Sequence, residues 1–494
     1  MYAKKLLPLG VAVEKNKENR FICLPKDVKS CIMSFVSGTD HIDIMYDCLL
    51  DRDKFILQTL FVDLNLLNVR MDGEQDMPLL MFVTCNDDQG DIDDEMIDYI
   101  LGLQGFDIDA GNGENSTALM AACHKGRDDL VKKFIENGAN YNYRGAAECS
   151  PLMLAVSKGH TNVVETLINS AKEMEGEGNV QELIVDSLDE SGWTPLTIAC
   201  QEGDAKIVDL LVAEGACPWH VTKEGHCPIH LAANGGHFSI VKSLIDAARN
   251  HDKSDITISK VINCPTIGDG FTPLMFAAQH AHYDIVKLLV ETGAKMSLEQ
   301  KDGCTAMHVA LLVGHLDIVL YLIEQGTDIN IKDVDGMAPL HIASESGYIT
   351  LVRAMIAHGA DVDILTDEGA TSLQSACSEG HLEIVFALIE AGAALNIQDD
   401  TYGHSPLGCA AANGLTAVVK ALIDAGADID ITAHAGETPI MMAICNNHLG
   451  PVEALIEAGC DLKIHDDQDN TAFDYSRENP EIRAVLWKEM AKDT

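Results

Sequence analysis

The chain has 494 residues, with 34 lysines and arginines against 77 aspartates and glutamates, which gives a formal charge of −43. A protein this acidic repels phosphate backbones and anionic lipid surfaces, so we expect neither nucleic acid nor membrane as a partner. Hydrophobic residues make up 47% of the chain, a share typical of folded proteins and not of disordered ones.

The first 30 residues oppose the overall charge, with seven basic and three acidic residues. Lys4-Lys5 before the short apolar stretch 6–13 is similar to a weak signal peptide, but charged residues follow at once, and we expect no secretion. The 15 cysteines show no CxxC spacing, so we expect reduced thiols. These features predict a cytoplasmic protein, with the nucleus as a second expected compartment.

Residues 24–36 carry a possible helical motif, in which Leu24-Pro25 leads into an apolar stripe that includes Ile32 and Val36. This stretch resembles the first half of an F-box, the module that links substrate receptors to a cullin-type ubiquitin ligase, although no second half is recognisable. The alternative is that the apolar spacing within 39–61 forms a helix pair that caps the following array. We therefore predict that residues 1–70 are an N-terminal helical region or cap.

An acidic run extends from Asp87 to Asp109, with nine acidic and no basic residues. A calcium loop requires oxygen ligands at fixed places, two of which Cys85 and Gln89 occupy here, so the pattern fails as a calcium site. The run is predicted to be a solvated acidic face, with a docking surface for a basic partner as the alternative.

A repeat of about 33 residues organises most of the chain. Copies begin at Met77, Thr117, Ser150, Thr194, Cys227, Thr272, Thr305, Ala338, Thr371, Ser405, Thr438 and Thr471. Five residues after the start, every copy from Thr117 to Thr438 has alanine, and nine residues after it most have glycine. Proline often follows the start directly, as in a helix whose first turn tolerates it. Each copy is therefore predicted to be a short helix, a turn, a second helix and a polar hairpin.

This register resembles the ankyrin repeat, with about 12 units over residues 71–494. The resemblance implies an all-α solenoid of stacked helix-turn-helix units with hairpin loops, elongated and curved. It also implies that Thr305 with His308, and likewise His341 and His230, hydrogen bond to neighbouring backbone. Ala281 and Asn447 depart from the pattern because they replace the turn glycine.

Two longer spacings place insertions near residues 171–185 and 250–266. Loop growth of this length costs little closure entropy, so a tolerated insertion is one interpretation. The other is that the insertions flank a binding site around the unit that begins at Thr194.

A group of potential metal ligands lies within 14 residues, and it comprises Cys217, His220, His226, Cys227 and His230. Their number would suffice for zinc. However, His230 and Cys227 already occupy the repeat's histidine and threonine positions, so we expect neither a metal nor a cofactor. No phosphate loop, HExxH or GxSxG motif is present, and the chain is predicted not to be an enzyme.

The resemblance implies that hairpins and first helices face partners along a concave groove, so the residue before each start is a candidate contact. We predict a partner-binding surface at Trp193, Trp219, His226, Phe271, Met337 and His404, because rigidly held aromatic residues often anchor protein recognition. Alternatively, Trp193 and Phe271 pack only on neighbouring hairpins. The predicted function is a monomeric, non-enzymatic scaffold for other proteins, including ones with basic surfaces. The alternative is a ubiquitin-ligase substrate receptor that uses residues 24–36.

Overall fold

The computed structural model describes residues 70–71, 77–86, 94–102, 106–175, 184–251 and 255–491. The F-box-like stretch 24–36 and the predicted cap helices within 39–61 lie outside these residues, as does part of the acidic run. The chain forms two compact units, residues 1–223 and 224–494.

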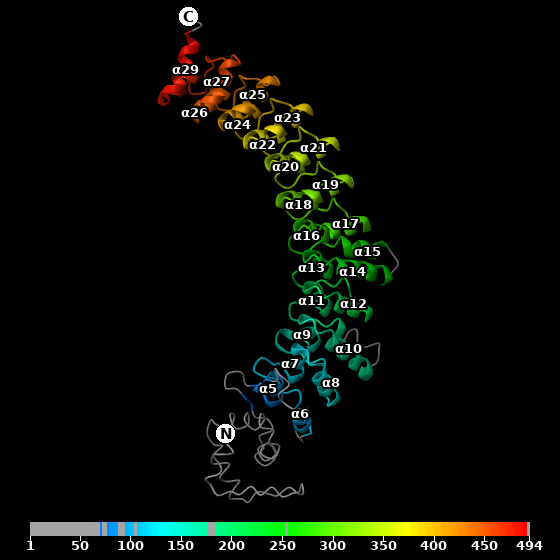
Figure 1. Cartoon of the computed structure of the whole chain (residues 1–494). Coiled ribbons are helices and arrows are strands. Elements are labelled where there is room, and N and C mark those ends of the chain that lie inside the picture. The colour runs from blue at the N-terminus through cyan, green and yellow to red at the C-terminus, as the bar shows by residue number, and fades with distance from the viewer. Residues whose placement is uncertain are drawn as a thin grey trace, which may run out of the picture. The chain divides into compact units, whose positions relative to one another are not determined.

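The first unit stacks helix pairs in which a first and a second helix alternate along the chain (Figure 1). Its first helices are α5 (Leu79–Asn86), α7 (Ala118–Lys125), α9 (Pro151–Ser157) and α11 (Pro195–Glu202). Its second helices are α6 (Asp94–Leu101), α8 (Asp128–Glu136), α10 (Thr161–Glu175) and α12 (Ala205–Ala213). A 3₁₀ turn, η3 (Ala146–Glu148), precedes α9, and strands β1 (Arg70–Met71) and β2 (Met77–Pro78) pair antiparallel before α5.

The second unit repeats the same arrangement. Its first helices are α13 (Pro228–Asn234), α16 (Pro273–Gln279), α18 (Ala306–Val313), α20 (Pro339–Glu345), α22 (Ser372–Glu379), α24 (Pro406–Ala412), α26 (Pro439–Cys445) and α28 (Ala472–Tyr475). Its second helices are α14 (Phe238–His251), α17 (Tyr283–Thr292), α19 (Leu316–Glu324), α21 (Ile349–Ala357), α23 (Leu382–Glu390), α25 (Thr416–Asp424), α27 (Leu449–Glu457) and α29 (Pro480–Met490). The additional elements are α15 (Asp255–Ile262) and η5 (Ser476–Glu478). The predicted all-α repeat architecture is confirmed.

The first helices from α7 onward begin at caps that the repeat register supplies. In the α22 repeat, Thr371 Oγ1 accepts the Gln374 backbone N–H at 3.2 Å, and Gln374 Oε1 accepts the Thr371 N–H at 2.6 Å. His308 fills the same role in α18, since its Nδ1 accepts the Thr305 N–H at 3.2 Å and its Nε2 lies 3.3 Å from the carbonyl oxygen of Met337. His230 and His341 repeat this pattern, so the expected backbone bonds of the three histidines are confirmed.

The turn glycine makes room for a side chain of the next repeat. A Cβ on Gly347 would lie 2.8 Å from a ring atom of His381, whose Nε2 lies 2.9 Å from the carbonyl oxygen of Glu345. Gly347 also has φ +79°, a conformation that side-chain-bearing residues rarely adopt. Ala281 and Asn447 replace the glycine and still adopt the left-handed turn, each with φ +60°.

Acidic and amide side chains connect consecutive hairpins. Asp363 Oδ1 accepts the Ala394 N–H at 2.8 Å, and Asp430 Oδ1 accepts the Asp461 N–H at 2.9 Å. Asn330 and Asn396 make equivalent bonds to the hairpins that follow them. Part of the acidic excess therefore satisfies backbone donors and does not serve only as a solvated face.

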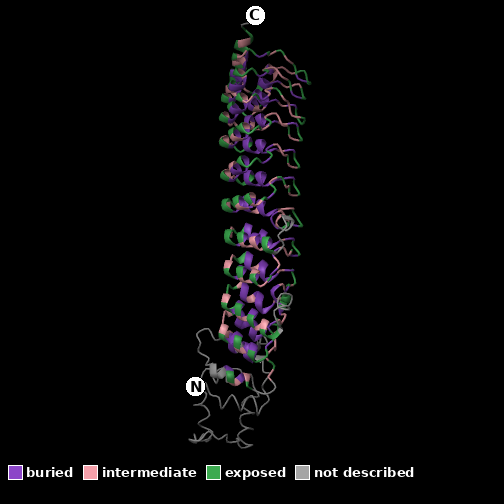
Figure 2. Ribbon diagram, turned by 90° about the vertical axis from the view of Figure 1, so that its right-hand side faces the viewer, coloured by how far each residue is buried: buried purple, intermediate pink, exposed green. Residues whose placement is uncertain are grey.

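The core lies between the two helix layers of each unit, where buried residues form a continuous band (Figure 2). The alanines five residues after each start, from Ala122 to Ala443, are fully buried, which lets paired helices approach closely. Cys123, Cys200 and Cys377 are buried beside them, as predicted, and burial raises the pKa of each thiol.

The two predicted insertions coincide with longer second helices. α10 has 15 residues and α14 has 14, whereas α19 and α21 have nine each. Residues 176–183 and 252–254 lie outside the described residues, and α15 follows the second gap. Among the described helices, none combines the length and apolar character that crossing a bilayer requires.

Candidate protein-binding groove

The six predicted contact residues are all half-buried. Trp193 and Trp219 belong to the first unit, and the other four belong to the second. A side-chain oxygen fixes the backbone at several of these residues: Trp193 N–H donates to Asp189 Oδ1 at 2.7 Å, Met337 N–H to Asp333 Oδ1 at 2.8 Å, and Phe271 N–H to Thr266 Oγ1 at 2.9 Å. These side chains are therefore presented from ordered hairpins.

His226 and Phe271 share an aromatic neighbour that the sequence analysis missed. The Phe276 ring centroid lies 5.2 Å from that of Phe271 and 6.2 Å from that of His226. The ring of each of these two predicted contact residues therefore lies near Phe276 on the first helix α16, within the second unit. Phe276 stands four residues after its start, so the register alone would have identified it as a neighbour of the hairpin.

His404 stacks on Tyr402 with ring centroids 5.4 Å apart and an interplanar angle of 24°. Asp399 holds both backbones, with its Oδ1 accepting the Tyr402 N–H and its Oδ2 the His404 N–H. Tyr402 is exposed, so this hairpin presents a paired aromatic surface.

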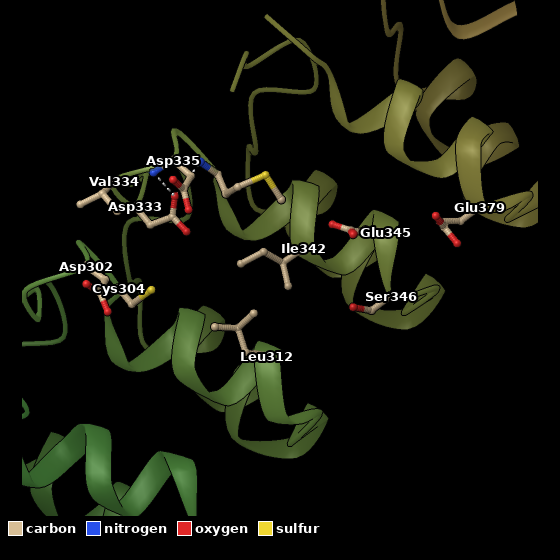
Figure 3. A pocket seen from close by; sticks show the side chains of 11 residues that line it. Asp302, Cys304, Leu312, Asp333, Val334, Asp335, Ile342, Glu345, Ser346 and Glu379 are labelled. Atoms are coloured by element: carbon tan, nitrogen blue, oxygen red, sulfur yellow. Dashed lines mark hydrogen bonds between the residues drawn. The ribbon is translucent and has the colours of Figure 1, made fainter. Parts of the chain in front are cut away.

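Met337 lines a hollow of the second unit, a groove of about 750 Å³. Its lining residues come from two hairpins and from α18, α20 and α22 (Figure 3). They are Asp302, Cys304, Leu312, Asp333, Val334, Asp335, Met337, Ile342, Glu345, Ser346 and Glu379. We refer to these eleven residues as the 302–379 groove.

The floor of the 302–379 groove is apolar, although it is open to solvent. Leu312 is 63% exposed and Val334 is 59% exposed, whereas Ile342 is buried. Leu312 at the end of α18 and Ile342 on α20 point toward the same space (Figure 3). Apolar side chains held open in this way favour contact with another apolar group.

The rim of the groove is acidic. Asp302, Asp333 and Asp335 lie on the hairpin side, and Glu345 and Glu379 lie at the ends of first helices (Figure 3). Within the described part of the chain, none of these five carboxylates forms an ion pair. Of the five, only Asp333 forms side-chain hydrogen bonds with described residues, because its Oδ1 accepts the backbone N–H groups of Asp335 and Met337. The groove thus combines an apolar floor with uncompensated negative charge.

Met337, which the sequence predicts as a partner contact, lines this groove, whereas Leu312, Val334, Glu345 and Glu379 were not among the predicted residues. A signal for the first two was present, because the neighbouring repeats have other kinds of residue at these positions. The glutamates are unremarkable in the sequence, and only the stacking of α20 and α22 brings them to the same rim.

The cysteine–histidine group differs from the one that the sequence predicted. Among the described residues, the potential ligand atoms that meet belong to Cys227, His230 and Cys264, all within 4.8 Å of one another. Cys217 and His220 instead form hydrogen bonds to other segments. The Cys217 N–H donates to Asp186 Oδ1, and His220 Nε2 lies 2.9 Å from the carbonyl oxygen of Gly192.

The chemistry of this group favours a hydrogen-bonded cluster over a metal site. His230 Nδ1 accepts the Cys227 N–H at 2.9 Å, which leaves the proton on Nε2, 2.8 Å from the carbonyl oxygen of Cys264. Neither ring nitrogen then has a lone pair to offer. The side-chain hydrogen bond with Cys227, followed by burial, raises the pKa of the Cys264 thiol, which disfavours a thiolate ligand.

A family model described as ankyrin repeats (3 copies) matches residues 80–177, 174–259, 247–333, 331–399 and 392–466. The chain is 28% identical over 140 residues to the ankyrin repeat and KH domain-containing protein mask-1 of Caenorhabditis elegans, which is 28% of this chain and 5% of that protein. It is 30% identical over 114 residues to the protein mask of Drosophila melanogaster, 23% of this chain and 3% of that protein.

A third relative is the human ankyrin repeat and SOCS box protein 3, 29% identical over 105 residues, which cover 21% of this chain and 18% of that protein. The chain thus matches only a small part of each relative, and the names of the relatives describe different proteins that share the repeat. The comparisons support the repeat and provide no support for the F-box resemblance at residues 24–36.

Proposed function

We propose that this chain, which belongs to the ankyrin-repeat family, is a scaffold that binds partner proteins on the face formed by its hairpins and first helices. The observation that carries the proposal is the 302–379 groove, which is lined by the exposed Leu312 and Val334 and by the buried Ile342. An apolar hollow on a rigid scaffold favours binding, because little conformational freedom is lost when a partner docks.

Half-buried residues before other starts of the second unit add to this face. Met337 belongs to the groove itself, and His404 with Tyr402 lies on another hairpin of the same unit. We propose Trp193, Trp219, His226 and Phe271 as further partner contacts, supported by their partial exposure and by the carboxylate that fixes Trp193. Replacing Trp193 and Phe271 by alanine is expected to reduce partner capture while the melting transition stays nearly unchanged.

The same proposal describes a non-enzymatic, monomeric protein of the cytoplasm or nucleus. The charge of −43 supports protein partners over nucleic acid or membrane surfaces. Partners with basic surfaces are favoured for the same reason.

Site-specific crosslinking tests the proposal. A photo-crosslinking amino acid replaces Val334 on the groove or, as the matched control, Phe386, an exposed residue on the second helix α23. In cells that express the full chain, we expect position 334 to crosslink defined proteins that position 386 does not, and Leu312→Arg to abolish those products. Identical products from both positions, or products insensitive to Leu312→Arg, would refute binding at this face.

A further inference from the structure

The repeat that begins at Thr305 has apolar residues at two positions near the end of its first helix where the other repeats do not. Seven residues after the start, the other copies from Thr117 to Thr438 have a polar or small residue, and eight residues after it they have a polar residue or glycine. Here the two positions are Leu312 and Val313, which are 63% and 52% exposed. Neither side chain is needed to fill the core, so packing does not explain their apolar character.

A second exception lies opposite, on the hairpin. Four residues before each start, the copies from Thr194 onward have a polar residue or glycine, except that Val334 precedes Ala338. Leu312 and Val334 line the same groove (Figure 3). Apolar exceptions from two different segments thus line one groove, as expected of a contact surface and not of random surface variation.

The charge around these apolar residues is strongly one-sided. Residues 301–400 contain 16 acidic and three basic residues, a net charge of −13, and residues 354–419 contain nine acidic residues and no lysine or arginine. Five of the carboxylates rim the groove, and the side-chain oxygens of Asp302, Asp335, Glu345 and Glu379 accept no hydrogen bond from the described residues. A cationic ligand would therefore meet carboxylates that are not already neutralised.

We infer that the 302–379 groove binds a short cationic segment of a partner protein, in which one or two large apolar side chains lie between lysines or arginines. The apolar side chains contact Leu312, Val334 and Met337, and the flanking cations face Asp335 on the hairpin side and Glu345 and Glu379 on the helix side. This inference rests on the proposed function and adds the chemistry of the partner.

The dimensions of the groove agree with a short segment. A volume of about 750 Å³ accommodates a few side chains and not a folded domain. The rim charge disfavours acidic segments, and it raises the rate at which basic segments arrive.

The test measures binding of the full chain to three labelled six-residue peptides by fluorescence anisotropy. The first peptide has two leucines between two pairs of lysines, the second has serines in place of the leucines, and the third has glutamates in place of the lysines. We expect the first to bind at least about tenfold more tightly than the second and the third to show no binding.

Matched variants locate the site. The variant Asp335→Asn/Glu345→Gln/Glu379→Gln neutralises the rim, and a control variant makes the same charge change at exposed second-helix positions, Glu324→Gln/Glu383→Gln/Glu390→Gln. We expect the rim variant to weaken binding of the leucine peptide about tenfold or more and the control variant to change it by less than about threefold. Circular dichroism verifies that both variants remain folded.

The variant Leu312→Ser tests the apolar part, and it is expected to remove the preference for leucine over serine peptides. The inference is wrong if the rim and control variants weaken binding equally, because attraction would then be diffuse, or if leucine and serine peptides bind alike. If position 334 still crosslinks partners in that case, the proposed function stands and only the partner chemistry is refuted.

Discussion

Gly347→Ala is the most informative test of how consecutive repeats are held together. The substitution acts in two ways. The backbone at Gly347 has φ +79°, and a side-chain-bearing residue in this left-handed conformation is destabilised by about 1–2 kcal/mol. The added Cβ would also lie 2.8 Å from a His381 ring atom, so the ring must move.

Movement of the ring removes the hydrogen bond between His381 Nε2 and the carbonyl oxygen of Glu345, now 2.9 Å long. The loss of one such bond costs about 1 kcal/mol. Together the two effects predict that the free energy of unfolding decreases by about 2–3 kcal/mol.

Gly359→Ala is the matched control. Gly359 has φ +90°, but a Cβ there would meet nothing within 4 Å, so only the backbone cost of about 1–2 kcal/mol applies. The difference between the two variants therefore measures the contact with His381 alone.

Urea unfolding of the full chain by far-UV circular dichroism gives the overall change in stability. Because repeat stacks unfold in parts, hydrogen exchange read by mass spectrometry reports the local change around residues 339–390. We expect faster exchange in that segment for Gly347→Ala than for Gly359→Ala. Equal destabilisation by the two variants would refute the role of the histidine contact, as would an unchanged difference after His381→Ala.

Three further outcomes follow from the same structure. Ala281→Gly is expected to raise the free energy of unfolding by about 0.5–1 kcal/mol in urea titrations, because it relieves a left-handed φ of +60°; a decrease would contradict this. Burial lowers the pKa of both His308 and His341, so the unfolded chain binds more protons below about pH 6.5. Stability should therefore fall as pH decreases from about 6.5 to 5.5, by up to about 1.4 kcal/mol per pH unit for each histidine. Glutamine at both positions should flatten this slope, and an unchanged slope would contradict the prediction. Asn330→Ala, which removes an acceptor for the next hairpin's N–H, should cost about 1 kcal/mol and increase exchange of that amide; unaltered protection would exclude the bond as stabilising.

The sequence by itself determined the architecture. The 33-residue register identified the caps, the buried alanines and the histidines at His230, His308 and His341, and the structure confirms them. The reason is that ankyrin-type packing involves only residues within one repeat and the next, so every structural role recurs at a fixed position. The register also identified Ala281 as a replacement of the turn glycine, and the backbone there keeps the left-handed conformation of the turn.

Only the tertiary structure decided which unusual residues share a surface. Leu312 and Val334 come from the first helix and the hairpin of one repeat and Glu379 from another, and their place in one groove depends on how α18, α20 and α22 stack. Similarly, Cys264 joins His230, although this pairing is not evident from spacing. The local register determines each repeat's fold, whereas the exposure of a side chain depends on contacts with neighbouring repeats, and that exposure defines the candidate site.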